Sequence, residues 1–203
     1  MKISAIILAA GESKRMGSLN KLLLPIHEEP IIKIVCQNVI KAKLDQVILV
    51  TGHQSSEIKK VVPDQINQII YNAQWKNGMM SSISAGMSKL DDDIDGNLII
   101  LGDMPLISTK TIKLIKREFQ KYNGEHIVYP TFDNKQANPV IFPKKYFSEI
   151  LNSEGDRGCK KVLKKYPKDS ICIEFHSNEV IIDCDTRDDY FLVEKRKFNN
   201  VQT

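Results

Sequence analysis

Short apolar runs alternate with longer segments of helical periodicity along the chain, and this alternation restricts the fold more than any other feature of the sequence. The apolar runs predict strands at residues 3–8, 47–50, 68–71, 97–101, 127–129, 140–142, 171–175 and 180–182. The amphipathic segments predict helices at residues 30–43, 55–61, 78–90, 109–122, 145–151, 158–166 and 187–197. Because most of these strands are apolar on both faces, we expect an α/β protein of three-layer α/β/α architecture with a mostly parallel sheet.

The sequence shows no linker, low-complexity tract or internal repeat, so we expect residues 1–203 to form a single domain. The rhythm of strands and helices changes after about residue 130. We therefore expect an N-terminal part (about 1–130) that builds the first ligand site and a C-terminal part (about 131–200) that elaborates it. Hydrophobic residues make up 42% of the chain and charged residues 27%, the balance of a folded protein rather than a disordered one.

Charge and hydropathy exclude several classes of function. The 29 lysines and arginines against 25 aspartates and glutamates leave a net charge of only +4, which does not indicate a nucleic-acid-binding protein. The run Ile3–Ala10 is far shorter than the ~20 apolar residues of a membrane span, and the charged residues that follow it disfavour a signal peptide. We expect a cytoplasmic protein that binds neither membranes nor nucleic acid.

Cysteine and histidine spacing gives no metal site. We expect buried, reduced thiols at each of the scattered cysteines: Cys36, Cys159, Cys172 and Cys184. We expect surface or strand-end positions for the widely spaced histidines: His27, His53, His126 and His176.

The loop after the first predicted strand suits a polyphosphate. Ligands of open α/β sheets bind beyond the carboxyl ends of the strands. Here small residues from Ala9 to Gly17 allow close approach to the backbone, whose N–H groups can form an anion-binding nest. Arg15 and Lys21 add positive charge. The spacing is neither that of a Walker A motif nor that of a G-x-G-x-x-G fingerprint, and a solvated basic loop is the alternative interpretation.

Two aspartate segments follow predicted strands. Asp103 ends the strand at residues 97–101 on a Gly/Pro turn, and it is either a turn residue or a Mg²⁺ ligand. Asp183 and Asp185 precede the last predicted helix, where acidic residues also serve as N-caps. The residues alone leave the metal-ligand and the turn or N-cap interpretations open for both segments.

The first loop carries a resemblance to a known family. Residues 8–17, Leu-Ala-Ala-Gly-x-Ser-x-Arg-Met-Gly, resemble the signature loop of nucleotidyltransferases with the glycosyltransferase-A-like (nucleotide-diphospho-sugar transferase) fold, in particular the MobA-like NTP transferases. The Gly102–Pro105 segment and the segment at residues 183–189 are similar to the metal-binding motifs of that family. The resemblance implies that Asp103 and one of Asp183 and Asp185, with Asp185 preferred, hold Mg²⁺. It implies a catalytic role for Arg15, Lys21 and Asp103. It also implies nucleotide binding by Leu8, Ala9, Ala10, Gly11, Ser13 and Gly17.

A second segment indicates which branch of the family this is. Residues 75–82 read Trp-x-x-Gly-Met-x-Ser-Ser, which looks like the molybdenum cofactor cytidylyltransferase branch, and so does Ala10, where the guanylyltransferase branch more often has glycine. The resemblance implies that Gly78, Ser81 and Ser82 also bind the nucleotide, and it favours CTP over GTP.

Two later segments resemble the part of the family that receives the pterin. Residues 136–142 are similar to Gly-Asn/His-Pro-Val-Leu-Phe, with alanine in place of the glycine, and residues 155–160 are similar to Gly-Asp-x-Gly-Ala-Arg, with lysine in place of the arginine. The resemblance implies acceptor binding by Asn138, Pro139, Asp156 and Lys160; Asp156 is alternatively the N-cap of the following helix.

Together these motifs imply a Mg²⁺-dependent enzyme that moves CMP from CTP to the terminal phosphate of molybdopterin and releases pyrophosphate. The alternatives within this fold are a molybdopterin guanylyltransferase and a sugar-phosphate nucleotidyltransferase. A non-catalytic alternative is a carrier that delivers molybdopterin to a molybdenum hydroxylase apoenzyme, and a transient contact with such an apoenzyme is compatible with catalysis as well.

Overall fold

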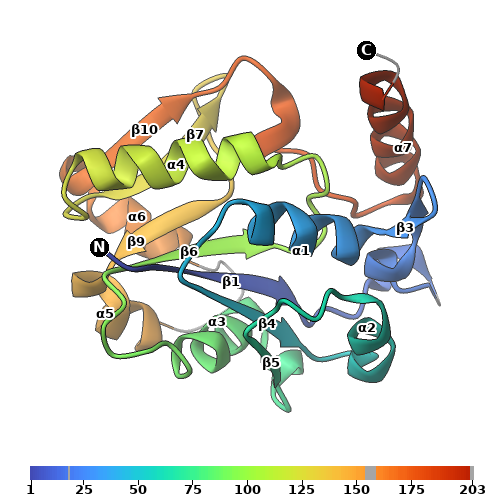
Figure 1. Cartoon of the computed structure of the whole chain (residues 1–203), viewed down its shortest axis with the longest axis horizontal. Coiled ribbons are helices and arrows are strands. Elements are labelled where there is room, and N and C mark those ends of the chain that lie inside the picture. Colours follow the sequence, from blue (N-terminus) through green and yellow to red (C-terminus); the bar gives the residue numbers. More distant parts are fainter. Residues whose placement is uncertain (18, 154–158, 202–203) are drawn as a thin grey trace.

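The computed structural model describes residues 1–203 except 18, 154–158 and 202–203, and leaves the side chains from 197 onward undescribed. Its centre is one twisted sheet whose main strands follow the order β10-β7-β9-β6-β1-β4-β5, with β8 added beside β7 (Figure 1). The strands of this sheet are β1 (Ile3–Ala9), β4 (Gln46–Thr51), β5 (Gln68–Tyr71), β6 (Gly96–Leu101), β7 (Ile127–Phe132), β8 (Lys135–Gln136), β9 (Val140–Pro143) and β10 (Ser170–Glu174).

The strand β1 lies in the middle of the parallel part of the sheet. It pairs in parallel with β4 on one side and with β6 on the other, and β4 pairs in parallel with β5. Six of its seven residues are buried, because helices cover both of its faces. The parallel arrangement brings the carboxyl ends of these strands to one edge, where the ligand site is expected.

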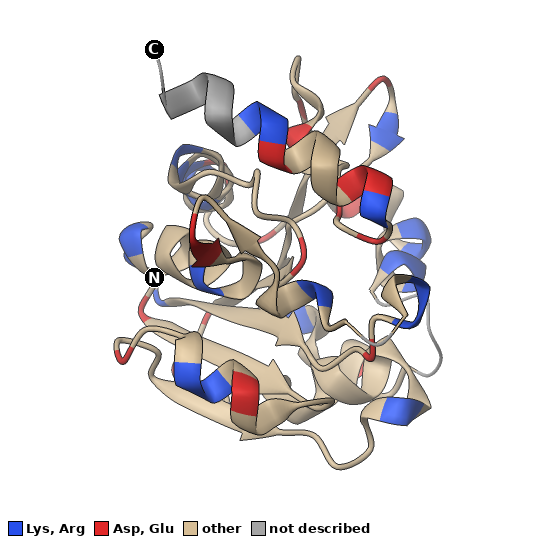
Figure 2. Cartoon of the chain, turned by 90° about the vertical axis from the view of Figure 1, so that its right-hand side faces the viewer, with Lys and Arg blue, Asp and Glu red and all other residues tan. Residues whose placement is uncertain are grey.

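Two layers of helices enclose the sheet, which confirms the predicted three-layer architecture (Figure 1). One apolar cluster joins the sheet to α1 (Ile31–Lys41), α2 (Ser55–Val61), α4 (Thr109–Lys121) and α7 (Arg187–Val201). The other cluster joins the opposite face to α3 (Met79–Met87), α5 (Phe147–Leu151) and α6 (Lys160–Lys165). In the view of Figure 2, Lys/Arg and Asp/Glu segments are interspersed rather than gathered into a patch of one sign.

The strand β9 runs against its neighbours. It is antiparallel to both β6 and β7, and β7 in turn pairs in parallel with β10. The register Ile99↔Val140 places the start of β9 near the carboxyl end of β6. The residues just before β9 therefore lie at the same edge of the sheet as the loops that follow β1 and β6.

Several predicted elements differ from the structure. The strand predicted at residues 180–182 is wrong: Asn178–Val180 form a 3-10 helix, and no strand follows among the described residues up to α7. The two-stranded hairpin of β2 (Pro25–Ile26) and β3 (Glu29–Pro30) was not predicted. Cys172 is exposed, contrary to expectation, because β10 is an edge strand whose residues alternate in exposure, whereas the other three cysteines are buried. No helix in the described part of the chain is long and apolar enough to cross a bilayer.

Candidate active site

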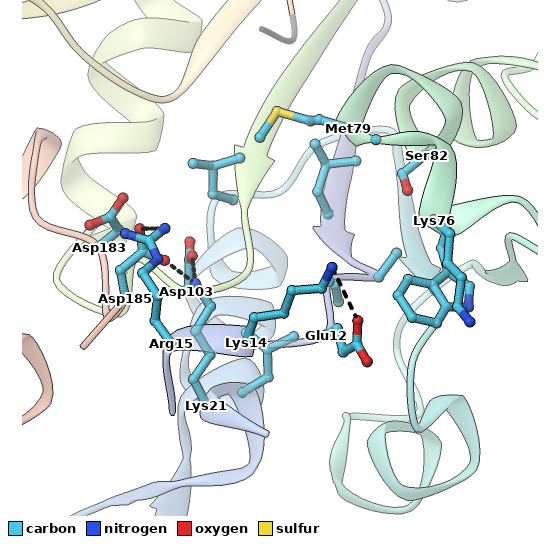
Figure 3. Close-up of a pocket in the computed structure, with 18 residues that line it drawn as sticks. Glu12, Lys14, Arg15, Lys21, Lys76, Met79, Ser82, Asp103, Asp183 and Asp185 are labelled. Atoms are coloured by element: carbon cyan, nitrogen blue, oxygen red, sulfur yellow. Dashed lines mark hydrogen bonds and ion pairs between the residues drawn. The ribbon is translucent and has the colours of Figure 1, made fainter. Parts of the chain in front are cut away.

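A cavity of about 660 Å³, here called the main cavity, opens where β1 and β6 end. Its walls come from the loop after β1, the N-terminal end of α3, the turn after β6 and the segment at residues 183–185 (Figure 3). Figure 3 shows the aspartates at one end of this cavity, and Lys76 and Ser82 at the other.

The loop after β1 is folded by two left-handed residues. Ser13 (φ 58°) and Gly17 (φ 72°) flank the 3-10 turn Lys14–Met16. The Ser13 hydroxyl accepts a hydrogen bond from the backbone N–H of Lys21 (3.2 Å), which ties the loop to the start of the next turn. Gly11 faces open space, since no atom lies within 4 Å of where its Cβ would be. The loop thus offers exposed backbone and two cations to a ligand in the cavity.

Three carboxylates meet at the acidic end. Asp103 follows β6, and Asp183 and Asp185 come from the segment before α7; each offers an oxygen within 4.8 Å of the others. A hydrogen bond from the Cys184 backbone N–H to the Asp103 carbonyl (3.0 Å) joins the segment before α7 to the turn after β6. Thr186 and Asp189, not Asp183 or Asp185, form the reciprocal cap of α7, so the pair at 183 and 185 is left for other roles.

Two cations hold this acidic end together. The Lys21 ammonium contacts Asp103 and lies 2.5 Å from Asp185 Oδ1. Arg15 donates to the other oxygen of Asp185 (2.5 Å). Only 13% of the Lys21 side chain and 15% of the Asp103 side chain is exposed, so this pair is poorly screened by solvent. Lys21 therefore links the turn after β6 to the segment before α7.

The charges in the cluster shift one another's pKa. Burial, together with the neighbouring Asp185 and Asp103 charges, raises the pKa of Asp183 above 3.8. Burial also acts to raise the pKa of Asp185, but hydrogen bonds and charge from Lys21 and Arg15 outweigh it and lower that pKa. Burial opposes the charge on Lys21, yet Asp103 and Asp185 outweigh it and raise its pKa above 10.5.

The donor set fits a divalent metal ion. Asp103 Oδ1 is buried and has no hydrogen-bond partner among the described residues, which is costly unless a cation binds it. Asp183 lies beside it with its own charge disfavoured by the other two carboxylates. Hard cations such as Mg²⁺ and Mn²⁺ prefer carboxylate oxygens. Asp103 and Asp183 thus join Asp185 as residues that could hold such an ion.

The opposite end of the main cavity is shaped around α3. Gly78 precedes α3 in a left-handed conformation (φ 94°), and Trp75 lies beside it in the 3-10 turn Trp75–Asn77. A Cβ on Gly52 would lie 2.7 Å from the Trp75 Cβ and 2.7 Å from the Ala10 carbonyl oxygen. The Trp75 ring also contacts the His53 ring in a tilted arrangement, with 5.6 Å between the ring centroids and 56° between the ring planes. Close packing of small residues therefore fixes this wall.

A second cavity of about 360 Å³ adjoins the first and shares Met79, Leu101 and Asp183 with it. Asn138 and Lys160, both predicted to bind the acceptor, line this second cavity. Its remaining walls are the side chains of Ile83, Ile99, Gln136, Val140, Phe142 and Cys159. Pro139 is not among the lining residues and follows a cis peptide bond. The predicted acceptor residue Asp156 lies outside the described residues.

The structure brings most of the predicted site residues together. Those that line the main cavity are Leu8, Ala9, Ala10, Gly11, Arg15, Lys21, Gly78, Ser82, Asp103, Asp183 and Asp185. Ser13, Gly17 and Ser81 are not among its lining residues. Ser13 and Gly17 shape the loop, and the Ser81 hydroxyl bonds to the Gly78 carbonyl (2.8 Å).

Other lining residues were not predicted. Glu12, Lys14, Lys76 and Met79 line the main cavity, and Lys14 lies 3.8 Å from Glu12. Trp75 also lines the main cavity. Trp75 and Met79 both belong to the motif at residues 75–82, which was the only sequence signal for these two lining residues. The contact of Lys21 with Asp103 and Asp185 had no local signal, because it joins residues far apart in the chain.

An exposed backbone loop facing a carboxylate cluster, at the carboxyl edge of a sheet covered on both sides, suits a protein that binds a nucleotide together with a divalent cation. Residues 5–170 match the model of the MobA-like NTP transferase domain, and the chain belongs to this family.

Known relatives agree with this assignment. The chain is 27% identical over 195 residues to the molybdenum cofactor cytidylyltransferase of Escherichia coli (strain K12), covering 96% of each chain. It is 27% identical over 167 residues to the "Probable molybdenum cofactor guanylyltransferase" of Methanosarcina mazei, covering 79% of this chain and 71% of that one. The crystal structure of the Mycobacterium tuberculosis H37Rv protein Rv0371C in complex with manganese superposes with a TM-score of 0.76 at 21% identity, covering 96% and 99%. The protein is a nucleotidyltransferase with the nucleotide-diphospho-sugar transferase fold.

Proposed function

We propose that this protein transfers CMP from CTP to the terminal phosphate of molybdopterin, giving molybdopterin cytosine dinucleotide and pyrophosphate. The observation that carries the proposal is the polarity of the main cavity, with the three carboxylates, Arg15 and Lys21 at one end and Lys76, Ser82 and the start of α3 at the other. A nucleoside triphosphate likewise has two unlike ends, a charged triphosphate that binds metal ions and cations and an uncharged base. The relative in E. coli, matched along almost its whole length, is named for cytidylyl transfer to the molybdenum cofactor.

The choice of CTP over GTP rests on the base end of the cavity. Ala10 and the Trp75–Ser82 segment carry the resemblance to the cytidylyltransferase branch, and both border the main cavity. Trp75 is packed against Gly52 and lies against the tilted ring of His53, so it forms a fixed wall. A fixed wall favours the smaller, single-ring base.

In the proposed reaction, an oxygen of the molybdopterin phosphate attacks the α-phosphorus of CTP. A phosphoanhydride bond forms there, the bond from the α-phosphorus to the bridging oxygen breaks, and pyrophosphate leaves with the electron pair. The attacking phosphate is already ionised, so no general base is required. The work of the protein is positioning and charge stabilisation.

The chain's own residues supply both. The part of the loop backbone that lines the main cavity, around Gly11, binds the triphosphate, and Arg15 stabilises charge on the leaving pyrophosphate. Lys21 turns from the carboxylates toward the α-phosphate as the nucleotide enters. Its flexible stem and three donors permit this change of partner.

We further propose that the bound metal ion is Mg²⁺, held by Asp103 with Asp185 and Asp183. When bound, Mg²⁺ neutralises phosphate charge and acts as a Lewis acid toward the phosphoryl oxygens. The buried, unpartnered Oδ1 of Asp103 supports this role.

We propose that the acceptor binds in the second cavity. Asn138 and Lys160 line it, and Asp183 is shared with the main cavity, so an acceptor phosphate there adjoins the α-phosphate of the nucleotide. On this proposal residues 1–130 of the single domain bind the nucleotide, and residues 131–200, with Pro139 and Asp156 among them, receive the acceptor. We also propose that this takes place in the cytoplasm and that the product passes directly to a molybdenum hydroxylase apoenzyme, for which co-purification of the two proteins is the test.

Pyrophosphate release by the purified protein with Mg²⁺ and molybdopterin tests the reaction, comparing CTP with GTP, ATP and UTP. We expect release with CTP alone. Release with GTP keeps the fold and the metal-binding carboxylates but overturns the choice of nucleotide. No release with any of the four, from protein shown to be folded, contradicts molybdopterin as acceptor.

A further inference from the structure

Asn72 is a buried amide directly after β5 that takes no part in lining either cavity. Only 5% of it is exposed. Its side-chain Oδ1 accepts a hydrogen bond from the backbone N–H of Gln74 (2.9 Å). Its Nδ2 donates to the hydroxyl oxygens of Ser81 (2.9 Å) and Ser82 (3.0 Å). One amide thus fixes the first turn of α3 to the end of β5.

The direction of these bonds is determined by the chemistry of the groups. A backbone N–H can only donate, so the amide oxygen of Asn72 must face Gln74. The amide nitrogen then faces α3, and it has hydrogens but no acceptor to offer. Both serine hydroxyls therefore accept from Asn72, and each retains one hydrogen to donate.

The two serine hydroxyls differ in whether an acceptor is present for that hydrogen. The Ser81 hydroxyl donates to the backbone, where the Gly78 carbonyl lies at 2.8 Å and the Gln74 carbonyl at 2.9 Å. The Ser82 hydroxyl has no acceptor among the described residues, although only 4% of Ser82 is exposed. Ser82 lines the main cavity, at the end away from the aspartates (Figure 3), and Ser81 does not line it. The spare hydrogen of the Ser82 hydroxyl is therefore available to a ligand in the main cavity.

We propose that Asn72 is a positioning residue that makes Ser82 a hydrogen-bond donor toward the nucleoside, so that this end of the cavity recognises an acceptor atom on the base. The inference rests on the proposed nucleotide site and adds that the protein donates this hydrogen bond and the base accepts it. Cytosine presents adjacent acceptors at O2 and N3, whereas N3 of uracil carries a hydrogen. A Ser82 hydroxyl held as a hydrogen-bond donor therefore favours cytosine over uracil.

The two serines make a matched pair for the test. Ser81→Ala and Ser82→Ala each remove one partner of Asn72 and one hydroxyl from the first turn of α3, but only Ser82 faces the cavity. The dissociation constant of CTP is measured by calorimetry with Mg²⁺ and no acceptor, and Tm is measured alongside. We expect Ser82→Ala to weaken CTP about tenfold, as for the loss of one hydrogen bond, with Ser81→Ala within about twofold of the unaltered protein.

A double-mutant cycle then separates the role of Asn72 from a purely structural one. Asn72→Leu, with Asn72→Ala as a second replacement, is combined with Ser82→Ala. Because Asn72 acts through Ser82, we expect its replacement to weaken CTP about tenfold alone and by less than about twofold in the Ser82→Ala background.

Two outcomes overturn the inference while leaving the proposed function intact. One is an undiminished effect of Asn72 replacement in the Ser82→Ala background, since a structural effect is additive. The other is an equal loss of CTP affinity in Ser81→Ala and Ser82→Ala. Failure of the unaltered, folded protein to bind any nucleoside triphosphate contradicts the proposed function and the inference together.

Discussion

The ammonium of Lys21 lies 2.5 Å from Asp185 Oδ1, although 164 residues separate the two in the chain. The same ammonium contacts Asp103. Lys21 thus contacts two of the carboxylates that a divalent cation would use. Lysine and metal are alternative partners of the same carboxylates, and nucleotide binding offers the lysine a third partner.

Replacement of Lys21 by methionine is therefore expected to strengthen metal binding in the absence of nucleotide. Removing the competing cation leaves the carboxylates to repel one another, and a divalent ion relieves this. We expect the dissociation constant for Mn²⁺, measured by electron paramagnetic resonance, to fall about tenfold in Lys21→Met. Lys14→Met is the matched control, because Lys14 lines the same cavity but pairs with Glu12. Equal affinities in the two variants would show that Lys21 does not compete.

Asp103→Ala is expected to leave a folded protein that turns over slowly. It removes the buried oxygen that has no other partner, and we expect a loss on the order of 10²-fold in turnover, as when a preorganised electrostatic group is lost. Pyrophosphate release at saturating Mg²⁺, with circular dichroism as the control for folding, checks it. Turnover close to that of the unaltered protein would rule out Asp103 as a metal ligand.

Two glycines, Gly11 in the wall of the main cavity and Gly52 behind it, are expected to respond differently to a methyl group. At Gly52 a Cβ would lie 2.7 Å from the Ala10 carbonyl oxygen, so Gly52→Ala should lower the free energy of unfolding by about 1–3 kcal/mol. At Gly11 no atom lies within 4 Å of that position, so Gly11→Ala should keep its Tm. Its methyl group enters the cavity and should weaken CTP about tenfold, because close approach to the backbone is lost. Denaturant unfolding and calorimetry of both variants separate these effects, and a destabilised Gly11→Ala protein would contradict the open geometry.

The stability of the protein at acid pH should depend on Asp169. Hydrogen bonds from Lys145 and Tyr146 hold the pKa of Asp169 below 3.8. A carboxyl whose pKa is lower in the folded state stabilises the protein above the unfolded value, and this contribution is lost as pH falls from 3.8 through the folded value. Asp169→Asn should therefore be less stable at neutral pH and lose less stability on acidification. Urea unfolding between pH 2 and 7 measures this. Glu57→Gln, which breaks an exposed pair with Lys60, is the control, and identical pH profiles of Asp169→Asn and the unaltered protein would refute the linkage.

Local patterns predicted much of the fold, because strands and helices that bury a face carry their own periodicity. The helix at residues 55–61 and the strand at residues 68–71 have the predicted bounds. The apolar run at residues 180–182 misled because Val180 is buried through a 3-10 turn, where its carbonyl accepts from Asn138. Two-residue strands such as β8 are too short for any periodicity to reveal.

The site was predictable only in part, for a related reason. Motifs located the loop after β1 and all three aspartates. The loop and Asp103 follow strands, whereas Asp183 and Asp185 precede α7. The motifs could not show that Lys21 pairs with carboxylates, or that Asn72 orients two serines, because both depend on contacts between separate elements. Ser81 and Ser82 are neighbours in one motif, yet only the fold distinguishes the hydroxyl that faces the cavity from the one that does not.

Because β9 is antiparallel to β6, its first residue lies at the rim of the sheet that carries the cavities, and its last residue lies at the opposite rim. Asn138, just before β9, lies at the rim where β1 and β6 deliver the reactive groups, while Pro143, at its end, is paired with Gly96 at the far rim. A chain that ran in parallel there would have carried these ends the other way round. Extra residues inserted after Pro143 would extend away from the substrates, so the molecule can acquire length or attachments on that rim while its catalytic rim stays unchanged.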